Sequence, residues 1–211
     1  MINFNKERNA CFGVAFLLMF IIGTYFVHIP WNISRLNISE SQLGFGIFIF
    51  GIFNFFSNQI SGRLVVPKIG TTNTIILGIM IFSFCPLLLI SVPNYNSFLI
   101  SWIPFGIAIG LLFPTMQTQI SIIEEKTSKI VTPLFQACFS AGSLFGALCA
   151  AFFIKNFPDP RITFFLIGSI FLIYIAIIFL CGMSYYRGKY NPSEERLFKL
   201  SRSKVESFIK C

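Results

Sequence analysis

The chain has 211 residues, of which 55% are hydrophobic and only 11% are charged, and its formal net charge is +8. Soluble domains carry roughly 25% charged residues, so this composition excludes an ordinary water-exposed surface. The basic residues lie in short segments between apolar stretches and in the last 28 residues. They do not gather on one folded region, which argues against nucleic-acid binding.

Six stretches are long and apolar enough to cross a bilayer, which takes about 20 residues because the hydrocarbon core is about 30 Å thick. In chain order they cover residues 10–28, 43–62, 74–92, 97–117, 134–154 and 162–183. The first is longer than the apolar core of a secretory signal and is followed by no small-residue cleavage site, so we interpret it as a retained helix. The sequence therefore predicts an all-α, polytopic membrane helical bundle of six transmembrane helices in residues 1–183, followed by a basic tail at 184–211.

Lysine and arginine are unevenly divided between the two sets of connecting segments. If the N-terminus is cytoplasmic, 13 of them lie inside and only Arg35, Lys155 and Arg161 lie outside. Cytoplasmic segments carry the excess of basic residues, so both termini are predicted to be cytoplasmic. Within the tail, residues 193–210 fit either an amphipathic helix on anionic headgroups or a plain solvated linker.

Polar side chains within the spans are the candidates for binding a solute. No Asp, Glu, Lys or Arg falls inside a predicted span, so there is no intramembrane carboxylate for proton coupling. Amides, hydroxyls and aromatic rings would suit a neutral polar solute such as a sugar, and the candidates are Tyr25, Asn54, Asn58, Trp102, Gln117, Gln136 and Ser140. The alternative for each is a purely structural interhelical hydrogen bond, worth roughly 0.6 to 2 kcal/mol.

Small residues recur at every fourth position in two spans, which lets a neighbouring helix approach closely. These residues, predicted to form packing seams, are Gly106 and Gly110 in the fourth span and Cys138, Gly142, Gly146 and Ala150 in the fifth. The second span carries Asn54, Ser57, Asn58 and Ser61 at helical spacing, so that face is expected to look towards protein or water. The only histidine, His28, lies near Trp31 and is interpreted as an interfacial anchor in preference to a proton-handling group.

The sequence offers little for metal or enzyme chemistry. Its six cysteines form no CxxC pair and it has one histidine, so neither a metal site nor a cofactor is expected. The metalloprotease HExxH, the hydrolase GxSxG and the ATP-binding GxxxxGK[ST] patterns are absent. An enzyme or an ATP-driven pump is therefore not indicated.

The segment between the second and third spans reads GRLVVPKIGT from Gly62 to Thr71. It resembles the loop motif of major facilitator transporters, G-x-L-a-D-R-x-G-R-R, which lies between the same two helices. Four positions carry over, namely Gly62, Arg63, Lys68 and Gly70. The acidic position of the motif is Val66 here, the second glycine is displaced by one residue, and threonines replace the final basic pair. In the family this loop helps to hold the cytoplasmic side in its outward-open arrangement.

Further segments follow in the order typical of a bacterial branch of that family, the fucose-permease and YbjJ-type transporters. They are HIPWNISRLNISESQLGFGIF, GRLVVPKIG and PLFQACFSAGSLFGALCAAF. The resemblance implies inverted three-helix repeats around a midplane solute site, alternating access by two six-helix halves, and a bacterial inner-membrane location. Because 211 residues correspond to one half, we expect either a transporter completed by a second copy or a separately encoded half, or a truncated or accessory protein without transport activity.

Overall fold

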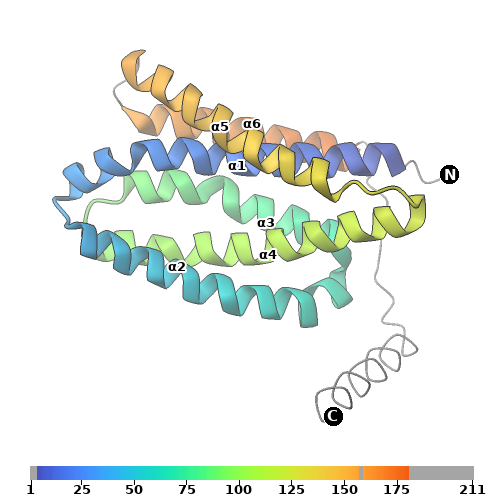
Figure 1. Ribbon diagram of the computed structural model, residues 1–211. Helices are drawn as coiled ribbons and strands as arrows, with labels where there is room; N and C mark the ends of the chain where they lie inside the picture. The colour runs from blue at the N-terminus through green and yellow to red at the C-terminus, as the bar shows by residue number, and fades with distance from the viewer. Residues whose placement is uncertain (1–3, 157–158, 181–211) are drawn as a thin grey trace, which may run out of the picture.

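The computed structural model describes residues 4–156 and 159–180, which form helices joined by short connections (Figure 1). In chain order these are α1 (Phe4–Leu36), α2 (Glu40–Ile60), the π-helix η1 (Ser61–Val65), α3 (Val66–Ser91), α4 (Tyr95–Thr127), α5 (Thr132–Asn156) and α6 (Pro160–Leu180). The described residues contain no strand, so the predicted all-helical class is confirmed. The predicted tail at 184–211 lies outside the described residues.

Local sequence signals set several helix ends. Ser39 caps α2 through a capping box with Gln42, because each side chain bonds the backbone N–H of the other residue. The Asn94 side chain accepts a 2.9 Å hydrogen bond from the backbone N–H of Ser97 at the start of α4. At the end of α3, Val92 precedes a proline and is extended, as that position favours.

The connection between α2 and α3 is helical, although its resemblance to a loop motif led us to expect a loop. Residues 40–91 form one run of 52 residues that includes η1. A straight helix of that length would extend about 78 Å, but the run bends at Gly70, whose φ of 83° is in the left-handed region that favours glycine. Consequently α2 and α3 both pack along α4.

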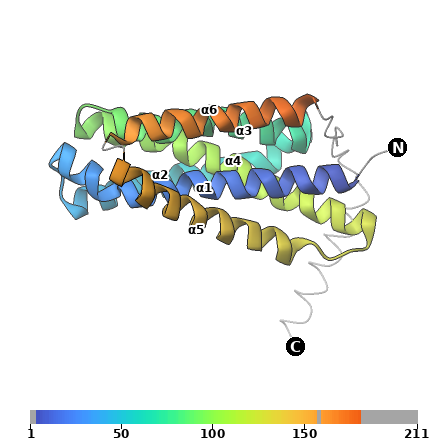
Figure 2. The ribbon, with the colours of Figure 1, turned by 90° about the horizontal axis from the view of Figure 1, so that it is seen from above.

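The described helices form two three-helix units, α1–α3 and α4–α6, and the first helix of each unit packs against helices of the other unit (Figures 1 and 2). Helix α1 packs mainly against α5, whereas α4 packs against α2 and α3, and α6 packs against α3. A continuous core of buried apolar side chains joins these helices, and its fully buried members include Leu18, Phe82, Phe98, Leu112 and Met116. Since the most extensive helix contacts, α1 with α5, α2 and α3 with α4, and α3 with α6, each join residues 4–91 to residues 95–180, the two three-helix units form one bundle.

Four helical stretches of the described residues are long and apolar enough to cross a membrane, at residues 7–36, 40–91, 95–127 and 132–155, and α6 has a shorter apolar segment at residues 160–174. The outer surface is also apolar. Phe48, Phe152 and Phe165 are each more than 60% exposed, an arrangement that water would disfavour and lipid accepts. The bundle is therefore a membrane bundle.

Candidate functional site

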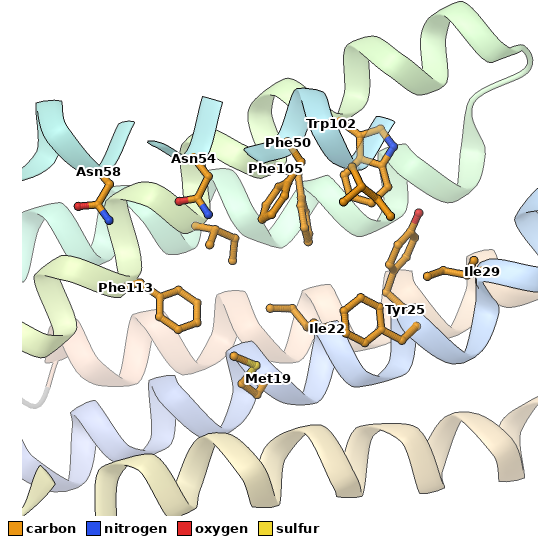
Figure 3. A pocket seen from close by; sticks show the side chains of 13 residues that line it. Met19, Ile22, Tyr25, Ile29, Phe50, Asn54, Asn58, Trp102, Phe105 and Phe113 are labelled. Carbon is orange, nitrogen blue, oxygen red and sulfur yellow. The ribbon is translucent and has the colours of Figure 1, made fainter. Parts of the chain in front are cut away.

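A pocket of about 560 Å³ opens between α1, α2 and α4 (Figure 3). This volume is within the range of roughly 300–1,000 Å³ that is usual for small-molecule sites. Thirteen side chains line it: Met19, Ile22, Tyr25, Phe26 and Ile29 from α1, Ile47, Phe50, Asn54 and Asn58 from α2, and Trp102, Phe105, Ile109 and Phe113 from α4. No α5 side chain takes part, even though α5 is the main partner of α1.

The polar groups of the pocket lie in two separate places. Asn54 and Asn58, one helical turn apart on α2, lie towards one end, and Tyr25 and Trp102 lie towards the other (Figure 3). The Tyr25 hydroxyl and the Trp102 indole N–H are buried and form no hydrogen bond of normal geometry among the described residues. The Asn32 side chain approaches the Tyr25 hydroxyl, but its amide nitrogen donates to the Leu89 carbonyl. A buried donor without a partner costs about 1–3 kcal/mol, so a molecule that accepts a hydrogen bond there would recover that free energy.

Aromatic rings form the wall between these two ends. Phe105 lies 5.3 Å from Phe50 and 5.6 Å from Trp102, measured between ring centroids. Tyr25 closes the same cluster from α1, with its ring centroid 5.9 Å from that of Trp102 and the two planes at 82°. Edge-to-face packing of this kind favours a fixed arrangement of the rings, so the wall is preformed.

Four of the seven predicted solute-binding residues line the pocket, namely Tyr25, Asn54, Asn58 and Trp102. The other three do not. Gln117 is half-buried on α4, one turn beyond Phe113, while Gln136 and Ser140 are exposed on α5. The Ser140 hydroxyl donates to the Gln136 carbonyl of its own helix at 3.4 Å.

The apolar lining was not predicted from the sequence. On α4 the residues Trp102, Phe105, Ile109 and Phe113 follow helical spacing, which also describes any buried helix face. The pattern alone therefore could not separate a pocket wall from the core.

The glycines of α5 form the predicted seam with α1. A Cβ atom on Gly142 would lie 2.2 Å from the carbonyl oxygen of Phe16, and one on Gly146 would lie 2.1 Å from that of Phe20. Neither fits without moving the helices apart. Of the other predicted seam residues, Ala150 is fully buried and Cys138 is half-buried.

The glycines of α4 form a matching seam with α2. A Cβ atom on Gly106 would lie 2.7 Å from the carbonyl oxygen of Phe50, and one on Gly110 would lie 2.6 Å from that of Asn54. The Ser57 hydroxyl, on the same face of α2, donates to the Ile107 carbonyl at 2.9 Å. The polar face of α2 is therefore directed towards α4 and the pocket, as the spacing of its residues predicts.

A family model described as Major Facilitator Superfamily matches residues 11–210. The chain belongs to the Major Facilitator Superfamily. Its members are transporters and not enzymes, so this chain is an integral membrane protein of the major facilitator type, in agreement with the apolar bundle. The comparison with curated proteins found no match.

The major facilitator loop motif spans η1 and the first turns of α3. Gly70 has the positive φ that requires glycine, whereas a Cβ atom on Gly62 would meet nothing within 4 Å. Arg63 and Lys68 are exposed. Only the second glycine of the motif is thus demanded by the backbone of this chain.

Two further features concern His28 and the side chains that could bind a metal. His28 is only 2% exposed, and its Nδ1 lies 2.8 Å from the Thr24 carbonyl oxygen while its ring meets that of Phe164. It lies inside the bundle, so the expected interfacial anchor is not what the structure shows. Within residues 4–156 and 159–180, no three His, Cys, Asp or Glu side chains lie together as a metal site would require.

Proposed function

We propose that the pocket between α1, α2 and α4 is this chain's part of a pathway for a small uncharged organic solute, which is moved by alternating access. The observation that carries the proposal is the pair of unpartnered donors on Tyr25 and Trp102, which lie in an otherwise apolar pocket. Most buried polar atoms in proteins are paired, so two unpaired donors in one pocket are an exception that a bound solute would explain. The solute class is kept broad here and includes the sugars expected from the sequence.

We propose further that a second six-helix half, either a second copy or a separate chain, covers the open side of the pocket. Asn58, which lines the pocket, is exposed, and so are Gln136 and Ser140 on α5. Amides exposed to hydrocarbon are costly because lipid offers them no hydrogen bonds. Protein or a water-filled path must therefore meet these residues.

The mass of the purified protein in mild detergent tests the choice of second half. Light scattering corrected for bound detergent is expected to give about twice the 23.9 kDa of one chain if two copies complete the pathway. A monomer that gains mass only with a co-expressed partner would assign the second half to another chain.

Transport is tested in proteoliposomes by counterflow of radiolabelled L-fucose and phenyl β-D-glucoside, two uncharged solutes with several hydroxyl groups, which cross protein-free bilayers slowly. Ile22→Trp fills the pocket and is expected to abolish uptake of any solute that the protein carries. The control is Leu166→Trp, because Leu166 is 53% exposed on α6 and does not line the pocket. A monomer that takes up neither solute and binds no small molecule in its pocket would favour the alternative, a non-transporting remnant or accessory subunit.

For topology we propose six spans, one for each of α1–α6, with both termini cytoplasmic in a bacterial inner membrane. The division of basic residues, 13 against three, supports this orientation. Fusions of a periplasm-dependent phosphatase after residue 36, 94 or 211 test it. Activity is expected at residues 36 and 94 only, and activity at residue 211 would reverse the assignment or change the number of spans.

We propose that the loop motif acts as in the family and favours the outward-open arrangement, through Gly62, Arg63, Lys68 and Gly70. We also propose, on the sequence resemblance, that the chain belongs to the fucose-permease-type branch. The exposure of Arg63 and Lys68 supports a role outside this bundle's own packing. Arg63→Gln and Lys68→Gln are expected to slow counterflow without changing the thermal stability of the bundle.

A further inference from the structure

We infer that the pocket selects an uncharged, amphipathic aromatic molecule, with an apolar body and a hydrogen-bond acceptor at the end that lies between Tyr25 and Trp102. The inference rests on the proposed function for the identity of the pocket as a solute site. It adds the chemical class of solute, and it disfavours both sugars and ions. The argument uses the wall, the two polar ends and the packing around Trp102.

The wall excludes a charged solute on the side that this chain supplies. None of the thirteen lining residues is charged, and nine of them are aliphatic, methionine or phenylalanine side chains. A buried ion without a partner is costly, and an ion in such a site needs an opposite charge and hydrogen bonds. The lining side chains offer neither to a carboxylate or an ammonium group, and Arg35, the cation that interacts electrostatically with Tyr25, is not among them and already donates to Asn32 and the Val92 carbonyl.

A sugar is also a poor match for this lining. A hexose carries several hydroxyl groups, each of which loses about 1–3 kcal/mol if it is buried without a partner. The pocket has polar side chains only at Tyr25, Asn54, Asn58 and Trp102. Between them Met19 offers only a weakly accepting sulfur and Ile22 offers no hydrogen-bonding group (Figure 3), so most hydroxyls in the middle of the pocket would stay unpaired.

The end of the pocket at Tyr25 and Trp102 is suited to binding one hydrogen-bond acceptor. Tyr25 is 1% exposed and Trp102 is 3% exposed, yet the hydroxyl and the indole N–H form no hydrogen bond of normal geometry among the described residues. Figure 3 shows the Tyr25 oxygen directed from α1 towards the Trp102 side of the pocket. The Tyr25 hydroxyl at this end can donate to a carbonyl oxygen or another neutral acceptor, while the Trp102 indole nitrogen lies beside Gly46 of α2 and closes the same end.

The packing of Trp102 argues against a cation held over its ring. Four rings contact the indole at centroid distances of 5.6–6.0 Å and interplanar angles of 66–90°, those of Tyr25, Phe50, Phe98 and Phe105. A cation needs an open aromatic face within about 6 Å of the centroid, and these neighbours crowd that space. An aromatic body extending along Phe50 and Phe105 instead continues the existing edge-to-face packing.

The chain has two tryptophans, which permits a direct test. In Trp31→Phe the only indole is Trp102, so its fluorescence reports on the pocket. The purified variant is titrated with 4-phenylbenzamide, its anionic analogue 4-phenylbenzoate, its cationic analogue 4-phenylbenzylammonium, and L-fucose. The Trp102→Phe protein, in which Trp31 reports, corrects for partition of each probe into detergent.

Saturable quenching of Trp102 fluorescence is expected for 4-phenylbenzamide. The two charged analogues and L-fucose are expected to bind at least about tenfold more weakly, because each would leave one or more polar groups without a hydrogen bond. Tighter binding of L-fucose or of either ion would overturn the inference. So would the absence of a response to all four probes. Because the titration needs no transport, a failure of counterflow with intact binding would count against the proposed function alone.

A second variant assigns the acceptor end. Tyr25→Phe removes the hydroxyl and keeps the ring, and in the Trp31→Phe background it is expected to weaken 4-phenylbenzamide binding about tenfold. The matched control is Tyr95→Phe, because the Tyr95 hydroxyl donates to the Gln42 carbonyl at 3.2 Å outside the pocket. Equal affinities of the two variants would overturn the role of Tyr25, and the four-probe comparison stands even if one variant does not fold.

Discussion

The α1–α5 and α2–α4 contacts bring helices together by the same means, a close approach at glycine residues. Gly142 and Gly146 belong to α5, the second helix of its three-helix unit, and they meet backbone carbonyls of α1. Gly106 and Gly110 belong to α4, the first helix of that unit, and they meet backbone carbonyls of α2. A Cβ atom on Gly23 of α1 would also lie 2.3 Å from the carbonyl oxygen of Ser143 on α5. Close approach therefore depends on residues without a side chain, and either helix can supply them.

The two seams differ in what they contribute to the pocket. Both seams include interhelical hydroxyl bonds, from Ser57 and from Ser61 of η1 to α4 and from Thr24 to the Gly146 carbonyl. In the α2–α4 seam, however, both helices supply side chains to the pocket. In the α1–α5 seam only α1 reaches the pocket. We conclude that the α1–α5 seam chiefly stabilises the bundle, whereas the α2–α4 seam also sets the shape of the pocket.

The largest expected effect is on stability, from Gly146→Ala. The new Cβ atom would lie 2.1 Å from the Phe20 carbonyl oxygen, and backbone shifts would also disturb the 3.1 Å hydrogen bond from Thr24 to the Gly146 carbonyl. Overpacking of this kind costs about 1–3 kcal/mol and occasionally more, and we expect a loss at the upper end of that range. Thermal unfolding in detergent, followed by circular dichroism, measures it.

The control for that variant is Gly51→Ala on α2. A Cβ atom there would meet nothing within 4 Å, so replacing glycine in this helix is expected to stabilise the protein slightly, by up to about 1 kcal/mol. If Gly146→Ala and Gly51→Ala unfolded at the same temperature, the α1–α5 seam would not be as tight as described.

Gly110→Ala separates the two seams. Its Cβ atom would lie 2.6 Å from the Asn54 carbonyl oxygen and 2.7 Å from Ser57 Cβ, so a smaller loss of about 1–2 kcal/mol is expected. Because the displaced segment of α2 carries Asn54 and Asn58, 4-phenylbenzamide binding should weaken more in Gly110→Ala than in Gly146→Ala. Fluorescence titration of Trp102, below the unfolding temperature of both variants, makes the comparison, and the opposite order would contradict the division of roles between the seams.

A hydroxyl within the α2–α4 seam should contribute less than its glycines. Ser61 is fully buried, and its Oγ lies 3.1 Å from Thr115 Oγ1. Interhelical hydrogen bonds in membranes average about 0.6 kcal/mol, so Ser61→Ala should cost about that much in thermal unfolding. Ser140→Ala is the control, since that exposed hydroxyl bonds only to its own helix. A loss in Ser140→Ala as large as in Ser61→Ala would mean that the assay does not resolve the seam.

The seams were predictable from the sequence because glycine every fourth residue has a direct steric meaning. The partners of the seams were not, since the spacing on α5 does not say that α1, and not α4, lies against it. The pocket was predictable only in its polar part. Asn54 and Asn58 stand out among apolar neighbours, whereas Phe105 and Ile109 look like any core residues.

Gln136 and Ser140 show why the remaining site residues could not be placed. Both are polar residues in an apolar span, the property that also identified Asn54 and Asn58. The structure directs them to the outer surface of α5 and away from the pocket. Polarity predicts that a residue avoids lipid, but only the rotation of the helix decides whether a pocket, another helix or a second half meets it.

The smallest effect is expected at the connection that joins the two seams, where α4 leads into α5. Glu124 Oε1 accepts hydrogen bonds from the backbone N–H groups of Val131 at 2.6 Å and Thr132 at 2.7 Å. These donors begin α5, where a helix favours negative charge. Glu124→Gln keeps an acceptor but loses the charge that strengthens both bonds. Faster hydrogen exchange at Val131 and Thr132 is expected, measured by mass spectrometry against Glu125→Gln, whose exposed side chain is the matched control.

The unfolding temperature should stay unchanged, because the connection lies outside both seams. Unchanged exchange in Glu124→Gln would show that the carboxylate does not hold the start of α5, and a lowered unfolding temperature would show that the two seams depend on each other through this connection.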